Sequence, residues 1–302
     1  MRQRRILAVG YLSIDTIETP TGRFERVPGG AALYAALGVR HAGALAGVVA
    51  AVGDDYPIQW LDVLAQMGID ISRVERRPGP TRTARLQHSA GGKRLSPLHG
   101  DDAWWQRTLA LSPPPLGDLG DVDGLVAGPM PVDALSAVIH QAARQKLHVI
   151  ADTSEAFAIH AAAQLLDLVS QLAAFAPSRE ETRLLLPGVT DDMAASSLAE
   201  RGMHVLQKRG ADGAWAVSAG GGPGIHMPAP PAVVIDPTGA GDATVGALAA
   251  HLFSAQSFMV AATAALSTGA VAVSGIGPAA LGLSTCDNFD LSHQEKHGLH
   301  RH

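Results

Sequence analysis

Short apolar runs alternate with longer stretches of helical periodicity along most of this chain. The runs predict strands, and the stretches between them predict amphipathic helices. Strands and helices that alternate in this way form parallel sheets with helical crossovers. We therefore predict an α/β fold of three αβα layers around a central, mostly parallel sheet. The predicted strands are 6–9, 47–52, 124–127, 148–151, 172–176 and 204–207, and the predicted helices are 31–41, 58–67, 132–145, 161–170, 180–185 and 193–201.

Two regions depart from this pattern. Residues 13–27 and 81–98 alternate apolar and polar positions and contain glycine turns at Gly22, Gly91 and Gly92. Such alternation is typical of hairpin strands. Inserted into a parallel domain, they predict a small projecting β-sheet that acts as a lid over a ligand site.

A long uncharged stretch could be mistaken for a membrane segment. Residues 243–286 contain no Asp, Glu, Lys or Arg. Gly269, Gly275, Gly277 and Pro278 would interrupt a single helix, whereas a spanning helix needs roughly 20 consecutive apolar residues. We expect two buried helices packed on the sheet and no membrane partner.

Composition narrows the class further. The net charge is -5, with no long basic run, so nothing favours nucleic acid as a partner. The single cysteine, Cys286, excludes an internal disulfide, and no secretory signal is evident, which predicts a cytoplasmic protein. Residues 1–290 contain no domain-separating linker and predict one domain, followed by a histidine-rich tail at 291–302 that we expect to be disordered.

The strongest local signal is residues 233–242, VVIDPTGAGD. An apolar strand is expected to end here in a glycine-rich turn that opens the helix 243–253. A helix N-terminus presents free backbone N–H groups, and the small residues Gly239, Ala240 and Gly241 allow an anion to approach them closely. Asp242 would repel a resting phosphate but could accept the proton of an attacking hydroxyl. On spacing alone, a tight turn followed by a helix-start aspartate explains these residues equally well.

These residues resemble the C-terminal signature of the ribokinase-like, or PfkB, carbohydrate kinases, Asp-x-Thr-Gly-Ala-Gly-Asp. The resemblance spans nearly the whole chain, with further matches at 10–15, 28–32, 52–55 and 67–70. It implies a kinase that uses ATP and Mg²⁺, with Asp242 as the base and Gly239, Ala240 and Gly241 as the anion hole. It also implies that the acceptor is contacted by four residues near the N-terminus: Asp15, Gly29, Gly30 and Ala31.

The resemblance also implies which residues bind the nucleotide and the metal ions. The residues carried over to nucleotide binding are Lys208, Gly210, Gly213, Thr238 and Glu181, with Glu181 and Asp236 as metal candidates and Asp236 and Thr238 as part of a K⁺ site. From the residues alone, a glutamate like Glu181 is more often an exposed helix-start residue, and a lysine like Lys208 is nearly as often a solvated strand end.

Three positions depart from the family pattern. Ala31, Ser154 and Ser178 stand where related chains commonly have asparagine, and Asn288 is the only asparagine here. A hydroxyl can replace some amide hydrogen bonds, but alanine can make none. The acceptor is therefore left open between sugars and polyols.

Two alternatives remain beside the sugar kinase. One is a nucleoside kinase, in which Tyr11, Tyr34, Trp104 or Trp105 stacks on a base. The other is a relative that binds ligand without turnover. Neither a GxxxxGK[ST] loop nor a GxGxxG fingerprint is present, which argues against other nucleotide folds. Edge-to-edge pairing of the lid predicts a homodimer.

Overall fold

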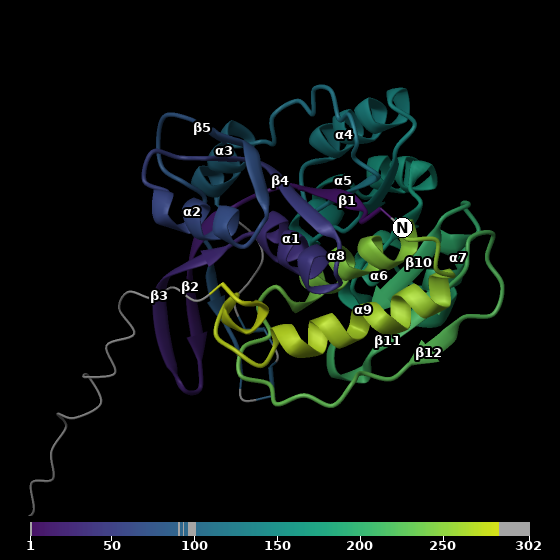
Figure 1. Ribbon diagram of the computed structural model, residues 1–302. Coiled ribbons are helices and arrows are strands. Elements are labelled where there is room, and N and C mark those ends of the chain that lie inside the picture. The colour runs from purple at the N-terminus through teal and green to yellow at the C-terminus, as the bar shows by residue number, and fades with distance from the viewer. Residues whose placement is uncertain (1, 90, 93, 96–100, 284–302) are drawn as a thin grey trace, which may run out of the picture.

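The computed structural model describes residues 2–89, 91–92, 94–95 and 101–283. A nine-stranded sheet runs through its centre in the order β12-β11-β10-β9-β8-β7-β1-β4-β5 (Figure 1). Neighbouring strands are parallel except β10–β11 and β11–β12. In chain order the strands are β1 Arg5–Val9, β4 Leu45–Val52, β5 Asp70–Arg76, β7 Gly124–Ala127, β8 His148–Ala151, β9 Ala174–Phe175, β10 His204–Lys208, β11 Ala214–Val217 and β12 Ile225–Met227.

Helices cover both faces of this sheet, which confirms the three-layer prediction. Because side chains alternate along a strand, β1 sends Ile6 and Ala8 to one core and Leu7 and Val9 to the other. The first core includes α1 Ala31–His41, α2 Ile58–Gln66, α8 Ala240–Phe253 and α9 Phe258–Ala272. The second includes α4 Val132–Arg144, α5 Glu155–Leu168, α6 Arg179–Leu185 and α7 Asp191–Ala199.

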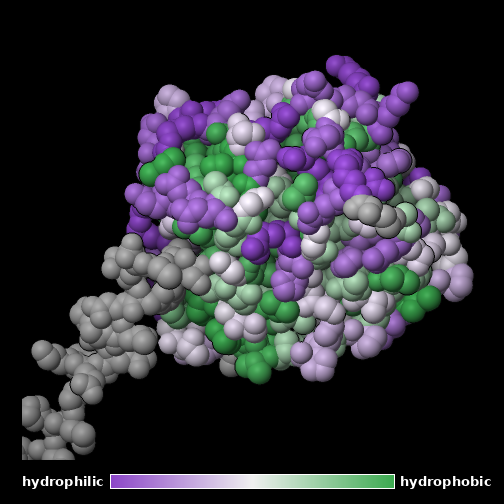
Figure 2. Space-filling view, viewed as in Figure 1, coloured by the Kyte–Doolittle hydropathy of each residue, from purple (hydrophilic) through white to green (hydrophobic). Residues whose placement is uncertain are grey.

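The remaining helical elements are α3 Asp102–Ala110 and the 3₁₀ turns η1 Val169–Gln171, η2 Gly210–Asp212 and η3 Ala279–Leu281. Among the described residues, no helix is both long enough and apolar enough to cross a bilayer. The expected pair of buried helices in the uncharged stretch is present as α8 and α9. On the face shown in Figure 2, polar and apolar side chains are interspersed.

A small second sheet projects from the body. It contains β3 Gly22–Gly29, β2 Ser13–Thr19 and β6 Arg85–Gln87, in that order (Figure 1). The first expected hairpin is confirmed, since β2 and β3 pair antiparallel. The second region contributes one short strand, β6, which pairs parallel with β2. The described part of 81–98 adds isolated bridges that join Arg82 to Ser13 and His88 to Arg94. The 291–302 tail lies outside the described residues.

The apolar run before the glycine-rich turn is not a strand, contrary to the prediction. Val233, Val234 and Ile235 are 77%, 48% and 41% exposed. The backbone N–H groups of Ile235 and Asp236 both donate to the carbonyl of Val273, in the loop after α9, and not to a neighbouring strand. β-branched residues alone therefore did not make a strand here, because no sheet edge lies beside them.

Candidate active site

The glycine-rich turn forms the N-terminus of α8. Gly239 is its N-cap residue, in the left-handed region at φ 72°. A Cβ at this position would overlap the ring of Tyr34, so both backbone conformation and space require glycine. At Gly241 the atoms nearest to an added Cβ belong to the Lys208 side chain, with Nζ at 3.4 Å. The turn therefore keeps the first N–H groups of α8 clear of side chains.

Asp236 fixes the start of this turn. Its side chain is fully buried; Oδ1 accepts the Thr238 N–H at 3.0 Å, and Oδ2 accepts the Gly277 N–H at 2.7 Å. His88 Nδ1, just after β6 of the small sheet, lies 3.5 Å from Oδ1. One carboxylate thus connects the turn to the loop after α9 and to the segment that follows β6.

Asp242 lies in the first turn of α8, beside a buried charge cluster. Asp152 follows β8, Glu181 lies on α6 and Lys208 ends β10, so three elements bring these side chains to the carboxyl edge of the sheet. Lys208 Nζ donates to Asp152 Oδ2. Three carboxylates therefore face a single ammonium group.

The cluster raises the pKa values of its acids. Burial, followed by the negative field of Asp152, raises the pKa of Asp242 to about 7. Burial, again reinforced by Asp152, raises the pKa of Glu181 to about 8. Burial also raises the pKa of Asp152 itself, although Lys208 opposes the shift. For Lys208, burial acts to lower the pKa, but the fields of Asp152, Glu181 and Asp242 outweigh it and raise the pKa.

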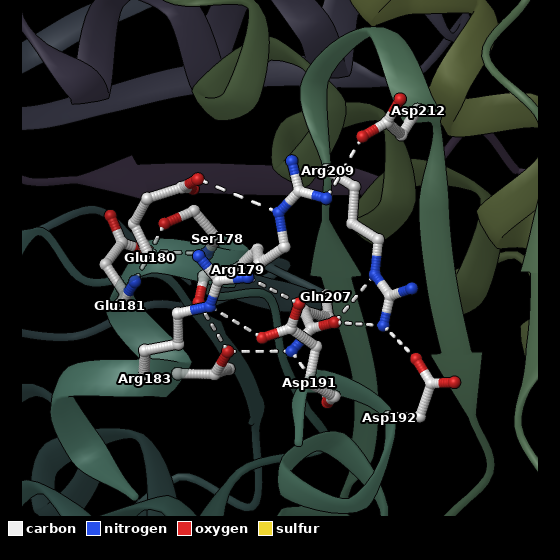
Figure 3. Close-up of polar contacts among 11 residues, drawn as sticks. Ser178, Arg179, Glu180, Glu181, Arg183, Asp191, Asp192, Gln207, Arg209 and Asp212 are labelled. Atoms are coloured by element: carbon white, nitrogen blue, oxygen red, sulfur yellow. Dashed lines mark hydrogen bonds and ion pairs between the residues drawn. The ribbon is translucent and has the colours of Figure 1, made fainter. Parts of the chain in front are cut away.

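Glu181 and Lys208 are both more buried than a chance surface residue. Glu181 is 8% exposed, and the Lys208 side chain is 14% exposed. Ser178 and Glu181 form a reciprocal capping box: Ser178 Oγ accepts the Glu181 N–H at 3.1 Å, and Glu181 Oε2 accepts the Ser178 N–H at 2.6 Å (Figure 3). Ser178 thus performs the capping that an asparagine could also supply.

Gly210 and Gly213 shape the connection between β10 and β11. Both have positive φ, 59° and 83°, and a Cβ on Gly213 would overlap the Met227 carbonyl. No group of three or more His, Cys, Asp or Glu is arranged to hold a metal in the described part of the chain. Mg²⁺ in phosphoryl-transfer sites needs only one or two carboxylates besides phosphates and water, so Glu181 remains a suitable partner.

The expected acceptor residues meet where β3 leads into α1. Asp15 is buried, and its Oδ1 accepts the Ala84 N–H at 3.0 Å. Burial raises the pKa of Asp15 to about 6. A Cβ on Gly29 would overlap the Asp15 carboxylate, and one on Gly30 would overlap the Tyr11 carbonyl. The paired glycines therefore allow the chain to pass directly over Asp15.

A pocket of about 800 Å³ opens at this side of the sheet. Ala31 and Ser154 lie on its wall, together with the rings of Tyr11, Trp104 and Phe157. Of the other aromatic candidates, Tyr34 is buried beneath Gly239, and Trp105 lines a different pocket.

Sequence reasoning missed Asp152, Arg82 and Arg94 as site residues. Asp152 could have been found, since it directly follows the predicted strand 148–151 at its carboxyl end, where ligands bind in parallel sheets. Arg82 and Arg94 lie in the lid region, and nothing in their local pattern distinguishes them from surface arginines.

Comparison with known proteins decides the family. The model of the pfkB family carbohydrate kinases matches residues 3–286. The chain belongs to this family. This PfkB kinase is 28% identical over 244 residues to a cytidine kinase of Thermococcus kodakarensis, covering 80% of this chain and 86% of that protein.

Solved structures share the fold of this PfkB kinase. A nucleoside kinase of Burkholderia thailandensis in complex with inosine has a TM-score of 0.76 at 22% identity, covering 91% and 92% of the two chains. A putative ribokinase II of E. coli in complex with ATP and Mg²⁺ has a TM-score of 0.71 at 22% identity, covering 92% and 94%. The ribokinase-like prediction is confirmed, and the chain is a phosphotransferase.

Proposed function

We propose that this kinase transfers the γ-phosphoryl group of ATP to a hydroxyl group of a small sugar or polyol, with Asp242 as general base. The observation that carries the proposal is the position of Asp242, in the first turn of α8 beside Lys208, with a pKa of about 7. A base with a pKa near the working pH combines a sufficient deprotonated fraction with a sufficient driving force for proton transfer.

In this proposal, each group of site residues has its own role in catalysis or binding. Asp242 accepts the proton of the attacking hydroxyl, and the N–H groups of Gly239, Ala240 and Gly241 stabilise charge on the phosphoryl group. Lys208 supplies positive charge from β10 beside the turn, while Gly210, Gly213 and Thr238 border the nucleotide. Asp15, Gly29, Gly30 and Ala31 orient the acceptor.

Mg²⁺ fits the same cluster. Glu181 and Asp152 are buried carboxylates whose pKa values are raised, and Lys208 is the single ammonium among them. A divalent cation would offset this excess negative charge and neutralise the phosphate oxygens of the nucleotide.

Asp236, although a metal candidate from the motif, already accepts two backbone N–H groups. A K⁺ ion near Asp236 and Thr238 stays a prediction, favoured by the buried Thr238 hydroxyl, which has no partner among the described residues.

The test is Asp242→Asn. We expect turnover to fall at least about 100-fold, because the general base is lost, while MgATP still raises the unfolding temperature as it does for the parent. ADP release measured with excess acceptor gives the rate. Turnover at a tenth or more of the parent rate would contradict the role of Asp242.

A nucleoside is the second candidate acceptor. Three aromatic rings, Tyr11, Trp104 and Phe157, line the acceptor pocket, and rings of this kind stack on bases. The likeness to a cytidine kinase points in the same direction. A panel of ribose, fructose, inositol, adenosine and cytidine decides between the two, since turnover of nucleosides alone would replace the sugar proposal.

A further inference from the structure

The acceptor pocket contains a concentration of guanidinium groups that no motif accounts for. Arg82, Arg85, Arg94 and Arg107 all line it, and Asp101 is the only acidic residue among the described residues of its wall. The chain as a whole has a net charge of -5. A neutral sugar or nucleoside gives no reason for so many cations on one wall.

Two of the four arginines, Arg85 and Arg94, already face acidic side chains. Arg85 pairs with Glu18, with Nε and one terminal nitrogen 3.0 Å and 2.8 Å from Glu18 Oε1. Burial lowers the pKa of Arg94, and the fields of Glu155, Asp15, Asp242 and Glu181 oppose the shift, so acidic groups already face Arg94. Arg82 and Arg107 remain for the acceptor.

Arg82 is held rigidly. Its guanidinium lies over the Tyr11 ring at 4.0 Å and over the Trp104 ring at 4.9 Å, and Nε donates to Thr108 Oγ1 at 3.1 Å. Asp15 lies nearby, but no ion pair within 4.0 Å joins the two side chains in the described residues. The terminal nitrogens are therefore a fixed fork, which loses little side-chain entropy when it binds a carboxylate or phosphate.

Arg107 reaches the same space from α3. Trp104 and Arg107 are three residues apart, so they share one helix face, and both line the pocket. The Arg107 side chain makes no hydrogen bond or ion pair with any described residue. Asp101, the acid of this wall, is the N-cap of α3 and accepts the Trp104 N–H at 2.8 Å. It does not neutralise Arg107.

Gln87 is the only amide side chain among the described residues that line the pocket, whereas four guanidinium groups line it. Ala31 and Ser154, which also line it, carry no amide. Guanidinium groups therefore outnumber amides as polar donors in this pocket. We propose that Arg82 and Arg107 select an acceptor that carries an anionic group, a phosphate or a carboxylate, in addition to the hydroxyl that faces Asp242. This inference rests on the proposed kinase function.

Matched acceptor pairs test it. Each pair adds one anion to the same skeleton: ribose and ribose 5-phosphate, fructose and fructose 6-phosphate, glucitol and gluconate, cytidine and cytidine monophosphate. With saturating MgATP, we expect kcat/KM for the anionic member of at least one pair to exceed that of its neutral partner about 100-fold. The phosphate and carboxylate pairs distinguish the two sources of charge.

Arginine variants locate the effect. Arg107→Gln and Arg82→Lys should raise KM for the anionic acceptor about 10- to 100-fold, with kcat and the KM for ATP nearly unchanged. Arg85→Gln is the matched control, because Arg85 lines the same pocket but is already paired. Equal effects of all three substitutions, or a preference for the neutral member of every pair, would overturn the inference.

Binding separates this inference from the kinase proposal. If the parent releases no ADP with any acceptor, the proposed function fails. The inference is then decided by thermal stabilisation with ribose 5-phosphate against ribose. If ribose 5-phosphate stabilises the parent and Arg107→Gln removes that stabilisation, the anion site is supported. If ribose 5-phosphate does not stabilise the parent, the inference is contradicted. It is also contradicted if the stabilisation survives in Arg107→Gln, because the phosphate then binds at the anion turn of α8.

Discussion

The surroundings of Asp242 shift its pKa in opposite directions. The helix N-terminus and Lys208 favour its carboxylate form, whereas burial and Asp152 favour its acid form. The balance leaves a base that is partly protonated near neutral pH. The space in front of it is kept open by two glycines whose requirements differ, because Gly239 is needed for its backbone and Gly241 only for its lack of a side chain.

That difference gives a paired prediction. Gly239→Ala should lower the free energy of unfolding by about 2 kcal/mol or more, because the residue must hold a positive φ and its methyl overlaps Tyr34. Gly241→Ala should keep or raise stability by up to about 1 kcal/mol, as alanine favours the helix. It should still weaken turnover, because the methyl enters the phosphoryl site. Urea unfolding and ADP release measure both effects, and parent-like turnover of a folded Gly241→Ala would contradict the anion hole.

At the scale of elements, two helices that carry the site are locked together. α1 begins beside the acceptor glycines, and α8 begins at the anion turn. Where they cross, a Cβ on Gly38 would overlap the Ala243 carbonyl, and one on Gly246 would overlap the Ala35 carbonyl. The two backbones are thus in direct contact, which fixes the acceptor side relative to the phosphoryl side.

Gly246→Ala should separate these helices. We expect a loss of about 1–3 kcal/mol in the free energy of unfolding, since overpacking a tight contact forces the backbone to shift. Turnover should fall as well, because Asp242 moves relative to the acceptor. Gly91→Ala is the control, since its added methyl meets no atom of the described residues within 4 Å. Unchanged stability and turnover in Gly246→Ala would show that the crossing is not tight.

The predicted elements were most accurate in the middle of the sheet. Residues 124–127 and 148–151 coincide with β7 and β8, because a strand buried on both faces is a plain apolar run with little competing pattern. The edge strands β5 and β12 were not predicted, since half-exposed strands mix polar and apolar residues. The four-residue strand β11, which lies between β12 and β10, was not predicted either. Helix α5 begins at Glu155 and not at 161, and 233–235 is not a strand.

The candidate site likewise has one part that could be predicted from the sequence and one part that could not. The turn containing Asp242 is contiguous, so a motif could reveal it, and the structure adds the burial and the helix start. The cluster of Asp152, Glu181 and Lys208 joins three distant segments, and only the fold brings them together. Their assigned roles, the K⁺ site, the cytoplasmic location and the lid-mediated homodimer stay predictions.

For the whole molecule, the site is a source of instability. Glu181 has a pKa of about 8 in the folded state, against an ordinary value of 4.5. Between these values the folded chain holds a proton that the unfolded chain releases. The free energy of unfolding therefore falls as pH rises from about 4.5 through about 8.

Glu181→Gln should remove the part of that dependence that comes from Glu181, and leave the parts that come from Asp242 and Asp15. Without nucleotide or Mg²⁺, we expect the variant to unfold at a higher temperature than the parent at pH 9, by about 2 °C or more, and to differ less at pH 6. Glu180→Gln, at the exposed neighbouring position, is the control. Thermal unfolding at both pH values measures the effect; parallel pH dependence in Glu181→Gln and the parent would show that Glu181 ionises freely.

The small sheet has an apolar cluster of its own, formed by Ile17, Val27 and Leu86 and separate from both main cores. A module that is packed internally can change its sequence with little effect on the layers that hold Asp242, except at His88, which lies against Asp236. New acceptor preferences can therefore arise through drift in the lid while the phosphoryl-transfer machinery is inherited intact. Exchange of residues 13–29 and 81–95 between relatives should therefore transfer acceptor preference and leave phosphoryl transfer in place.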